Sequence, residues 1–147
     1  MRFLDYPPIW LMGALALVWG ETVLAPDLVG WPLVRMVGTG LALIAVALFA
    51  LAAFEFLRAR STIIPHQSPS ALITRGIFAF SRNPISLADV LLLVGLSLRW
   101  GALSGLVLAP VLVWVLRLRF IEGEEARLRA AFGAAAEAYF ARVRRWL

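Results

Sequence analysis

Cysteine and lysine are both absent from this chain of 147 residues, and histidine occurs once. The lack of cysteine excludes disulfide bonds, thiolate nucleophiles and thiolate-bound metals. The lack of lysine excludes Schiff-base chemistry, and a single histidine excludes a histidine-rich metal site. We therefore expect no metal centre in this protein.

Charged residues are also scarce, at 16%, whereas hydrophobic residues make up 62% of the chain. A soluble domain of this size cannot bury that much apolar surface, so the chain must use lipid as its solvent. The length predicts a single domain, residues 1–147. In a membrane protein, the net charge of +5 at pH 7 indicates arginines at the lipid headgroups rather than nucleic-acid binding.

Long apolar runs predict an all-α integral membrane protein with about four transmembrane helices. The last two form a helical hairpin, in which the small residues Gly101, Gly105 and Ala109 allow close helix contact. A C-terminal amphipathic helix is expected over residues 122–146, with Gly133 as the position at which it would break. The predicted spans are residues 9–24, 33–57, 85–98 and 102–118.

The longest polar interruption, residues 58–84, separates the second and third predicted spans. Loops in compact proteins are usually much shorter, so this loop needs a functional reason, and we expect it to face a cofactor. His66 lies within it and has either a ligand contact or no special role. Glu21 and Glu55 are expected at the membrane interfaces.

The distribution of arginine predicts the orientation of the chain. With four spans, the N-terminus, the polar loop and the C-terminal tail lie on one side of the membrane. The opposite side holds only Arg35 and Arg99, and an excess of basic residues marks the cytoplasmic side. We therefore expect the loop and the tail to face the cytoplasm. The exclusive use of arginine favours a bacterial source, and with it the bacterial inner membrane.

Arg82, Asn83 and Pro84 open the third predicted span. A residue before proline is disfavoured in helical geometry, so Asn83 suits the N-cap, and Pro84 suits the first helical position. The free N–H groups of that helix, with Arg82 beside them, would bind a carboxylate or phosphate. The alternative is a plain helix start with Arg82 at the headgroups.

Three acidic residues are candidates for chemistry. Glu124 and Glu125 point about 100° apart on a helix, so one would bind a cationic ligand group while the other pairs with an arginine or caps the helix. The alternative is an acidic first turn favoured by the helix dipole. Asp89 lies one turn into the third span, and an acid at membrane depth is a functional candidate, unless it lies close enough to the headgroups to be hydrated.

An ordered series of short motifs runs through residues 60–147. The motifs are Thr62-x-x-Pro65, Leu72-Ile73-Thr74-x-Gly76-Ile77-Phe78, Ser81-Arg82-Asn83-Pro84, Glu124-Glu125-x-x-Leu128, Phe132-Gly133 and Val143-Arg144-Arg145-Trp146. The series resembles the bacterial isoprenylcysteine carboxyl methyltransferase-like proteins, a family related to the phospholipid N-methyltransferases.

The resemblance implies a membrane enzyme that holds S-adenosyl-L-methionine between the Arg82 loop and the Glu124–Glu125 step. The expected acceptor is a lipid-soluble or amphiphilic molecule that reaches the site from the bilayer, such as a phospholipid amine or a small hydrophobic carboxylate, thiol or amine. If the acceptor is an ammonium, Asp89 or Glu124 would be the catalytic base. The implied cofactor-binding residues are Leu72, Thr74, Gly76, Ile77, Phe78, Arg82, Asn83, Pro84, Glu124 and Glu125.

Three positions depart from the family pattern. In the first turns of the third span, the family usually has tyrosine where this chain has Ser86 and often glycine where it has Ala88. Asp89 is unusual among the methyltransferases. Asp89 is similar to an acidic residue of the related sterol and steroid reductases, which bind NADPH. An NADPH-dependent membrane reductase and a non-catalytic membrane scaffold are therefore the alternatives, whereas the Glu124–Glu125 step and the Phe132–Gly133 motif favour a methyltransferase.

Overall fold

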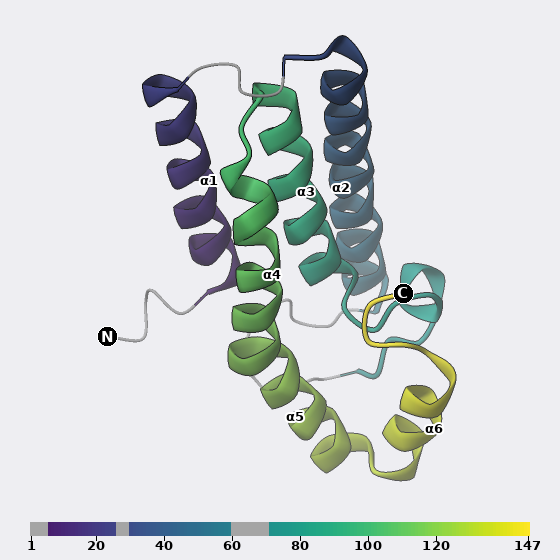
Figure 1. Cartoon of the computed structure of the whole chain (residues 1–147). Coiled ribbons are helices and arrows are strands. Elements are labelled where there is room, and N and C mark those ends of the chain that lie inside the picture. Colours follow the sequence, from purple (N-terminus) through teal and green to yellow (C-terminus); the bar gives the residue numbers. More distant parts are fainter. Residues whose placement is uncertain (1–5, 26–29, 60–70) are drawn as a thin grey trace.

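The computed structural model describes residues 6–25, 30–59 and 71–147 of the chain. Within these ranges the regular structure is helical, without a strand, which confirms the prediction of an all-α membrane protein. Four helices run side by side in alternating directions, and two shorter helices extend from one end of this bundle (Figure 1). The helices are α1 (Pro7–Leu24), α2 (Pro32–Ala59), α3 (Pro84–Trp100), α4 (Ser104–Leu116), α5 (Glu122–Phe132) and α6 (Ala134–Arg142).

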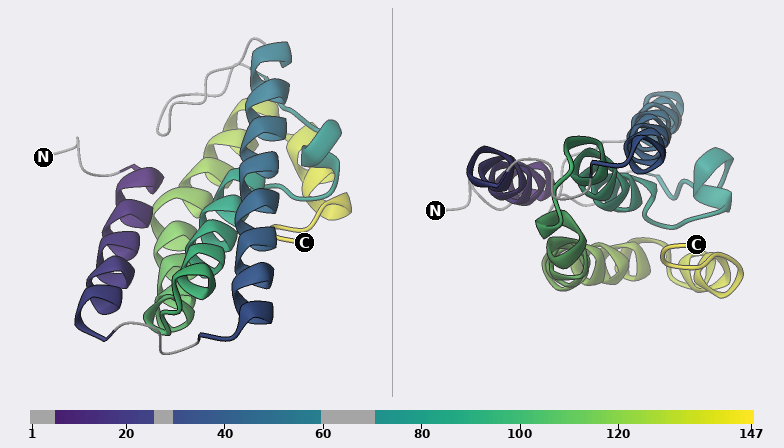
Figure 2. Two further views of the ribbon diagram at one scale, coloured as in Figure 1. Left: turned by 90° about the horizontal axis from the view of Figure 1, so that it is seen from above. Right: turned by 45° about the horizontal axis from the view of Figure 1, so that its top comes forward.

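α3 lies at the centre of the bundle and contacts α1, α2 and α4 (Figure 2). Three helices in the described part of the chain are long and apolar enough to cross a membrane, namely α1, α2 and the continuous helix Ser104–Phe132. α3 has 17 residues and is packed between its neighbours. The membrane topology with four spans therefore stays a prediction.

Prolines and glycines set the ends of several helices. α1, α2 and α3 begin at Pro7, Pro32 and Pro84, because proline has its φ angle fixed near the helical value and needs no N–H partner in the first turn. α3 ends at Gly101, whose φ of 77° is left-handed and favours glycine. Gly133, with φ of 50°, separates α5 from α6 in the same way.

The helix that contains the fourth predicted span continues past residue 118. α4 continues through a π-helical turn, Arg117–Ile121, into α5, so that Ser104–Phe132 forms one helix. Its apolar part ends at Ile121, and α5 begins with three acids in its first turn, so the chain turns polar while the helix continues. The predicted amphipathic helix is two helices, and residues 143–147 after α6 are not helical.

Small residues allow the helices to approach closely. A Cβ atom added at Gly105 would overlap the side chain of Ser97, so α4 and α3 are in tight contact there. A Cβ atom on Gly38 would lie 2.6 Å from the carbonyl oxygen of Gly95, and one on Gly95 would lie 2.7 Å from the backbone nitrogen of Ala42. The α3–α4 contact thus includes Gly105 of the predicted small-residue stripe, whereas the α2–α3 contact was not predicted.

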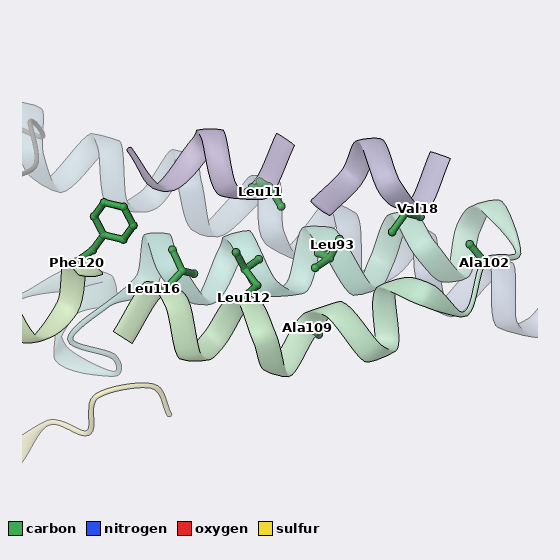
Figure 3. Packing of buried hydrophobic residues seen from close by; sticks show 8 residues of the cluster. All are labelled: Leu11, Val18, Leu93, Ala102, Ala109, Leu112, Leu116 and Phe120. Atoms are coloured by element: carbon green, nitrogen blue, oxygen red, sulfur yellow. The ribbon is translucent and has the colours of Figure 1, made fainter. Parts of the chain in front are cut away.

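The hydrophobic core lies where α1, α3 and α4 meet (Figure 3). Many large apolar side chains on the outer faces of α1, α2 and α4 are exposed, as expected for helices that face lipid. The buried core residues are Leu11, Val18, Leu93, Ala102, Ala109, Leu112, Leu116 and Phe120.

Candidate cofactor site

The two polar regions of the chain meet at one end of the bundle. That end contains the last turn of α2, the start of α3, and helices α5 and α6 (Figures 1 and 2). The Nη1 atom of Arg82, just before α3, lies 3.3 Å from the Oε1 atom of Glu125 on α5. The structure therefore brings together two segments that the sequence predicts to share one site.

Glu125 is 4% exposed and is held by two arginines. Arg145 donates to both carboxylate oxygens, from Nε at 2.9 Å and from Nη2 at 2.8 Å. Burial by itself raises the pKa of Glu125, but the hydrogen bonds from Arg145 and the charges of Arg82 and Arg145 outweigh it and hold the pKa below its ordinary value. Glu125 is therefore an anion at neutral pH whose positive partners belong to the protein itself.

The segment after α6 crosses the start of α3. The backbone N–H of Arg82 donates to the carbonyl oxygen of Arg144 at 3.0 Å, and Asn83 Nδ2 donates to the carbonyl oxygen of Arg145 at 3.0 Å. The expected N-cap at Asn83 is wrong in one respect, because its side chain makes no cap hydrogen bond. Its ψ of 60° lies outside the extended region typical of an N-cap, and its amide instead fastens the C-terminal segment to α3.

Arg145 is the site residue that sequence reasoning missed. It is held in place by its bidentate contact with Glu125 and by the Asn83 amide on its carbonyl oxygen. Its only signal in the sequence is its place in the closing motif Val143–Trp146, and spacing does not indicate which acid it contacts.

One N–H donor of the Arg82 guanidinium has no hydrogen-bond partner among the described residues. The guanidinium carbon of Arg82 lies 4.6 Å from the centre of the Phe140 ring, on α6, and its Nη1 contacts Glu125. Its Nε atom is buried and has no hydrogen-bond partner. Such a buried donor is suited to an acceptor group of a ligand, because native structures pair nearly all such groups.

An aromatic layer joins the short 3₁₀ helix η1 (Gly76–Ala79) to α2 and α6. The Tyr139 hydroxyl donates to the carbonyl oxygen of Phe78 at 2.7 Å, and the rings of Phe56 and Phe78 meet edge to face at 5.5 Å. Burial raises the pKa of Tyr139 to about 12, so its hydroxyl stays protonated at physiological pH. The buried Phe78 side chain therefore anchors η1 to the bundle.

Asp89 lies on the buried face of α3, one helical turn before the core residue Leu93. It is 1% exposed, and its Oδ2 atom has no hydrogen-bond partner. The structure therefore contradicts the alternative of a hydrated Asp89 at the headgroups. A buried carboxyl oxygen without a partner destabilises the fold, and an acid at membrane depth is a functional candidate, so Asp89 remains a candidate for chemistry.

The remaining predicted residues have varied environments. Glu124 is exposed on α5 beside the buried Glu125, whereas Pro84 is buried at the start of α3. Leu72, Thr74 and Ile77 are half-buried in the segment that leads to η1 and within it. His66 and residues 60–70 of the predicted cofactor-facing loop lie outside the described residues.

Glu55 is buried at the end of α2 and pairs with Arg75, whose Nε atom lies 3.1 Å from Glu55 Oε2. This ion pair ties the segment before η1 to α2, whereas the position of Glu55 at a membrane interface stays a prediction. Gly76 is part of this contact, because a Cβ atom there would overlap the Glu55 side chain and because its φ of 58° favours glycine.

These features define a helical membrane protein with an acid–arginine site at one end of its bundle. The chain matches the phospholipid methyltransferase family over residues 33–135. It belongs to that family, which implies that it is a membrane methyltransferase. No curated protein and no solved structure gives a significant match.

Proposed function

We propose that this protein transfers a methyl group from S-adenosyl-L-methionine to a lipid-soluble or amphiphilic acceptor. The observation that carries this proposal is the contact of Arg82 with Glu125, which joins the two polar regions at one end of a methyltransferase-family bundle. We infer that this end faces the cytoplasm of a bacterial cell, because the sequence places most arginines there.

The charged groups at this end suit the cofactor. The N–H groups at the start of α3, after Asn83 and Pro84, and the unpartnered Nε atom of Arg82 are donors for its carboxylate. The exposed carboxylate of Glu124 is available for its ammonium group, whereas Glu125 holds Arg82 and Arg145 in place. Glu125 is thus assigned a positioning role and Glu124 the direct contact.

The apolar part of the cofactor requires a different surface. Leu72, Thr74 and Ile77 are half-buried and so retain accessible surface, while Gly76 and the buried Phe78 fix the course of this segment against α2 and α6. We assign the adenine to this side of the site.

S-adenosyl-L-methionine supplies an electrophilic methyl group on a sulfonium. The protein has to align donor and acceptor and to exclude water, and no protein nucleophile is needed. For an ammonium acceptor, a proton must leave before attack, and Asp89 Oδ2 is a buried acceptor atom without a partner. We therefore assign Asp89 as the base for an amine acceptor, ahead of the exposed Glu124.

The cofactor assignment is tested by calorimetry on the purified protein. We expect binding of S-adenosyl-L-methionine and of its demethylated product, and no binding of NADPH. A preference for NADPH would select the membrane reductase, and binding of none of the three would select the scaffold. Incubation of the protein with methyl-labelled cofactor and a membrane extract would then identify the acceptor.

Glu124→Gln should weaken cofactor binding about tenfold, because it removes the charge of a hydrogen bond to an ammonium. Glu122→Gln is the matched control, since Glu122 lies in the same first turn and pairs with Arg117 at 2.8 Å. Equal affinity in the Glu124 and Glu122 variants would remove Glu124 from the site.

Asp89→Asn should lower the rate of methyl transfer to an amine acceptor by about 10²–10⁴ while leaving cofactor affinity unchanged. Ser97→Ala is the control, because Ser97 is another buried side chain of α3 whose oxygen has no partner. An unchanged pH–rate profile in the Asp89 variant would exclude the base role.

A further inference from the structure

α1 and α4 run side by side (Figure 1). A groove lies between them. Its volume is about 590 Å³, within the range of small-molecule sites. All of its lining residues are apolar or small: Ile9, Trp10, Gly13, Ala14, Leu17, Leu108, Val111, Leu112 and Val115.

The groove has the dimensions of one lipid chain in one leaflet. From Ile9 to Leu17 its α1 wall is about 12 Å long, and half of the bilayer hydrocarbon is about 15 Å thick. Gly13 opens the α1 wall, because a Cβ atom there would meet nothing within 4 Å. An acyl chain therefore fits along the groove without displacing a side chain.

One end of the groove is positively charged. Trp10 lines the groove, and the guanidinium carbon of Arg119 lies 5.2 Å from the centre of the Trp10 ring. Arg119 is exposed in the π-helical turn that follows α4, at the end of the bundle that also carries the Arg82–Glu125 contact. An apolar slot that ends in an arginine at headgroup level is complementary to a chain attached to a phosphate.

We propose that the α1–α4 groove binds an anionic phospholipid, with one acyl chain along Gly13 and the phosphate on Arg119. Glu125 is buried on the side of α5 that faces α3 and the C-terminal segment, whereas Arg119 faces α1. The groove is therefore a lipid site separate from the acid–arginine site, and it does not depend on methyl transfer.

The test is native mass spectrometry of the purified protein in detergent, titrated with phosphatidylglycerol or with phosphatidylcholine of the same chains. The parent protein should retain one phosphatidylglycerol in preference to phosphatidylcholine. Gly13→Leu should weaken retention of both lipids about tenfold, because its side chain fills the groove. Gly40→Leu is the matched control, since a Cβ atom at Gly40 on α2 also meets nothing within 4 Å.

The headgroup contact is tested separately. Arg119→Gln should reduce the preference for phosphatidylglycerol about fivefold, as expected for one arginine near an anionic headgroup. Arg117→Gln is the control, because Arg117 lies in the same π-helical turn and its loss removes the same charge. Lipid retention by Gly13→Leu equal to that of Gly40→Leu would overturn the chain site, and a full preference in Arg119→Gln would overturn the phosphate contact.

Discussion

Glu125 combines burial, negative charge and two arginine partners, and these properties link its ionisation to the stability of the fold. A buried ion pair contributes little net stability compared with apolar packing, but removal of one member leaves uncompensated charge. Here two guanidinium groups would lose their anion together. The consequences of a substitution should therefore be larger at Glu125 than at any acid in an exposed pair.

Glu125→Gln should lower the free energy of unfolding by about 3 kcal/mol. Glu137→Gln is the matched control, because Glu137 pairs with Arg129 at 2.7 Å in an exposed position and such pairs contribute about 0–1 kcal/mol. Guanidinium unfolding in detergent micelles, followed by circular dichroism, measures both values. Equal losses in the two variants would contradict a special role for the buried acid.

The depressed pKa of Glu125 also predicts how stability depends on pH. The stabilisation is present above the ordinary pKa of 4.5 and is lost as the pH falls through the lower pKa of the folded state. The unfolded chain takes up the proton first, because its carboxyl has the higher pKa, so acid favours unfolding. The unfolding midpoint of the parent protein should decrease as the pH is lowered from neutral to about pH 3. The decrease should be smaller in Glu125→Gln. A parallel pH dependence in both proteins would show that other groups dominate.

At the scale of the helices, close contact between α2 and α3 depends on two glycines. Gly38, near the start of α2, and Gly95, near the end of α3, bring the two backbones together, so the α2–α3 contact is tight there. Glycine in a helix interior is intrinsically unfavourable, so the close packing of α2 on α3 is the reason for glycine at these two positions.

Gly95→Ala should destabilise the protein by about 1–3 kcal/mol, because the added methyl group has to displace the backbone of α2. Gly40→Ala is the control and should stabilise by up to about 1 kcal/mol, since its methyl group meets open space and alanine favours the helix. Unfolding in sodium dodecyl sulfate gives the order of the three proteins. A Gly95→Ala variant as stable as Gly40→Ala would contradict the close approach.

Local sequence signals predict several helix ends correctly but not the continuity of two helices. Pro32, Pro84 and Gly101 mark helix ends through their own backbone preferences, so the sequence alone indicates them. The continuity of α4 with α5 was missed, because the change from apolar to acidic residues at Glu122 marks the end of the lipid-facing part and not the end of the helix.

For distant segments, the sequence predicts which segments share a site but not which side chains pair. The sequence indicated that Arg82 and the Glu124–Glu125 step share a site, but not which acid is buried. That choice depends on the angle at which α5 leaves the bundle and on Arg145, which returns from beyond α6. Pairings of this type are set by the tertiary fold and leave no periodic pattern in the sequence.

For the whole molecule, the orientation in the membrane can be tested directly, because the chain has no cysteine. Ala138, on α6, and Trp31, directly before α2, are exposed and suit substitution by cysteine. α6 and the start of α2 lie at opposite ends of the molecule (Figure 1). In right-side-out vesicles an impermeant maleimide should label Trp31→Cys, and Ala138→Cys should be labelled only in inverted vesicles. Labelling in the reverse pattern would place the acid–arginine site outside the cytoplasm.

The central position of α3 has a consequence for biogenesis. α3 has 17 residues and carries Asp89, and an aspartate at a helix centre opposes insertion by about 2.5–3.5 kcal/mol, an effect that weakens towards the helix ends. Its neighbours α1, α2 and α4 surround it only in the completed bundle. We therefore expect the nascent α3 to depend on α2, its most extensive packing partner, which emerges before it, and the two helices should enter the lipid as one cooperative unit.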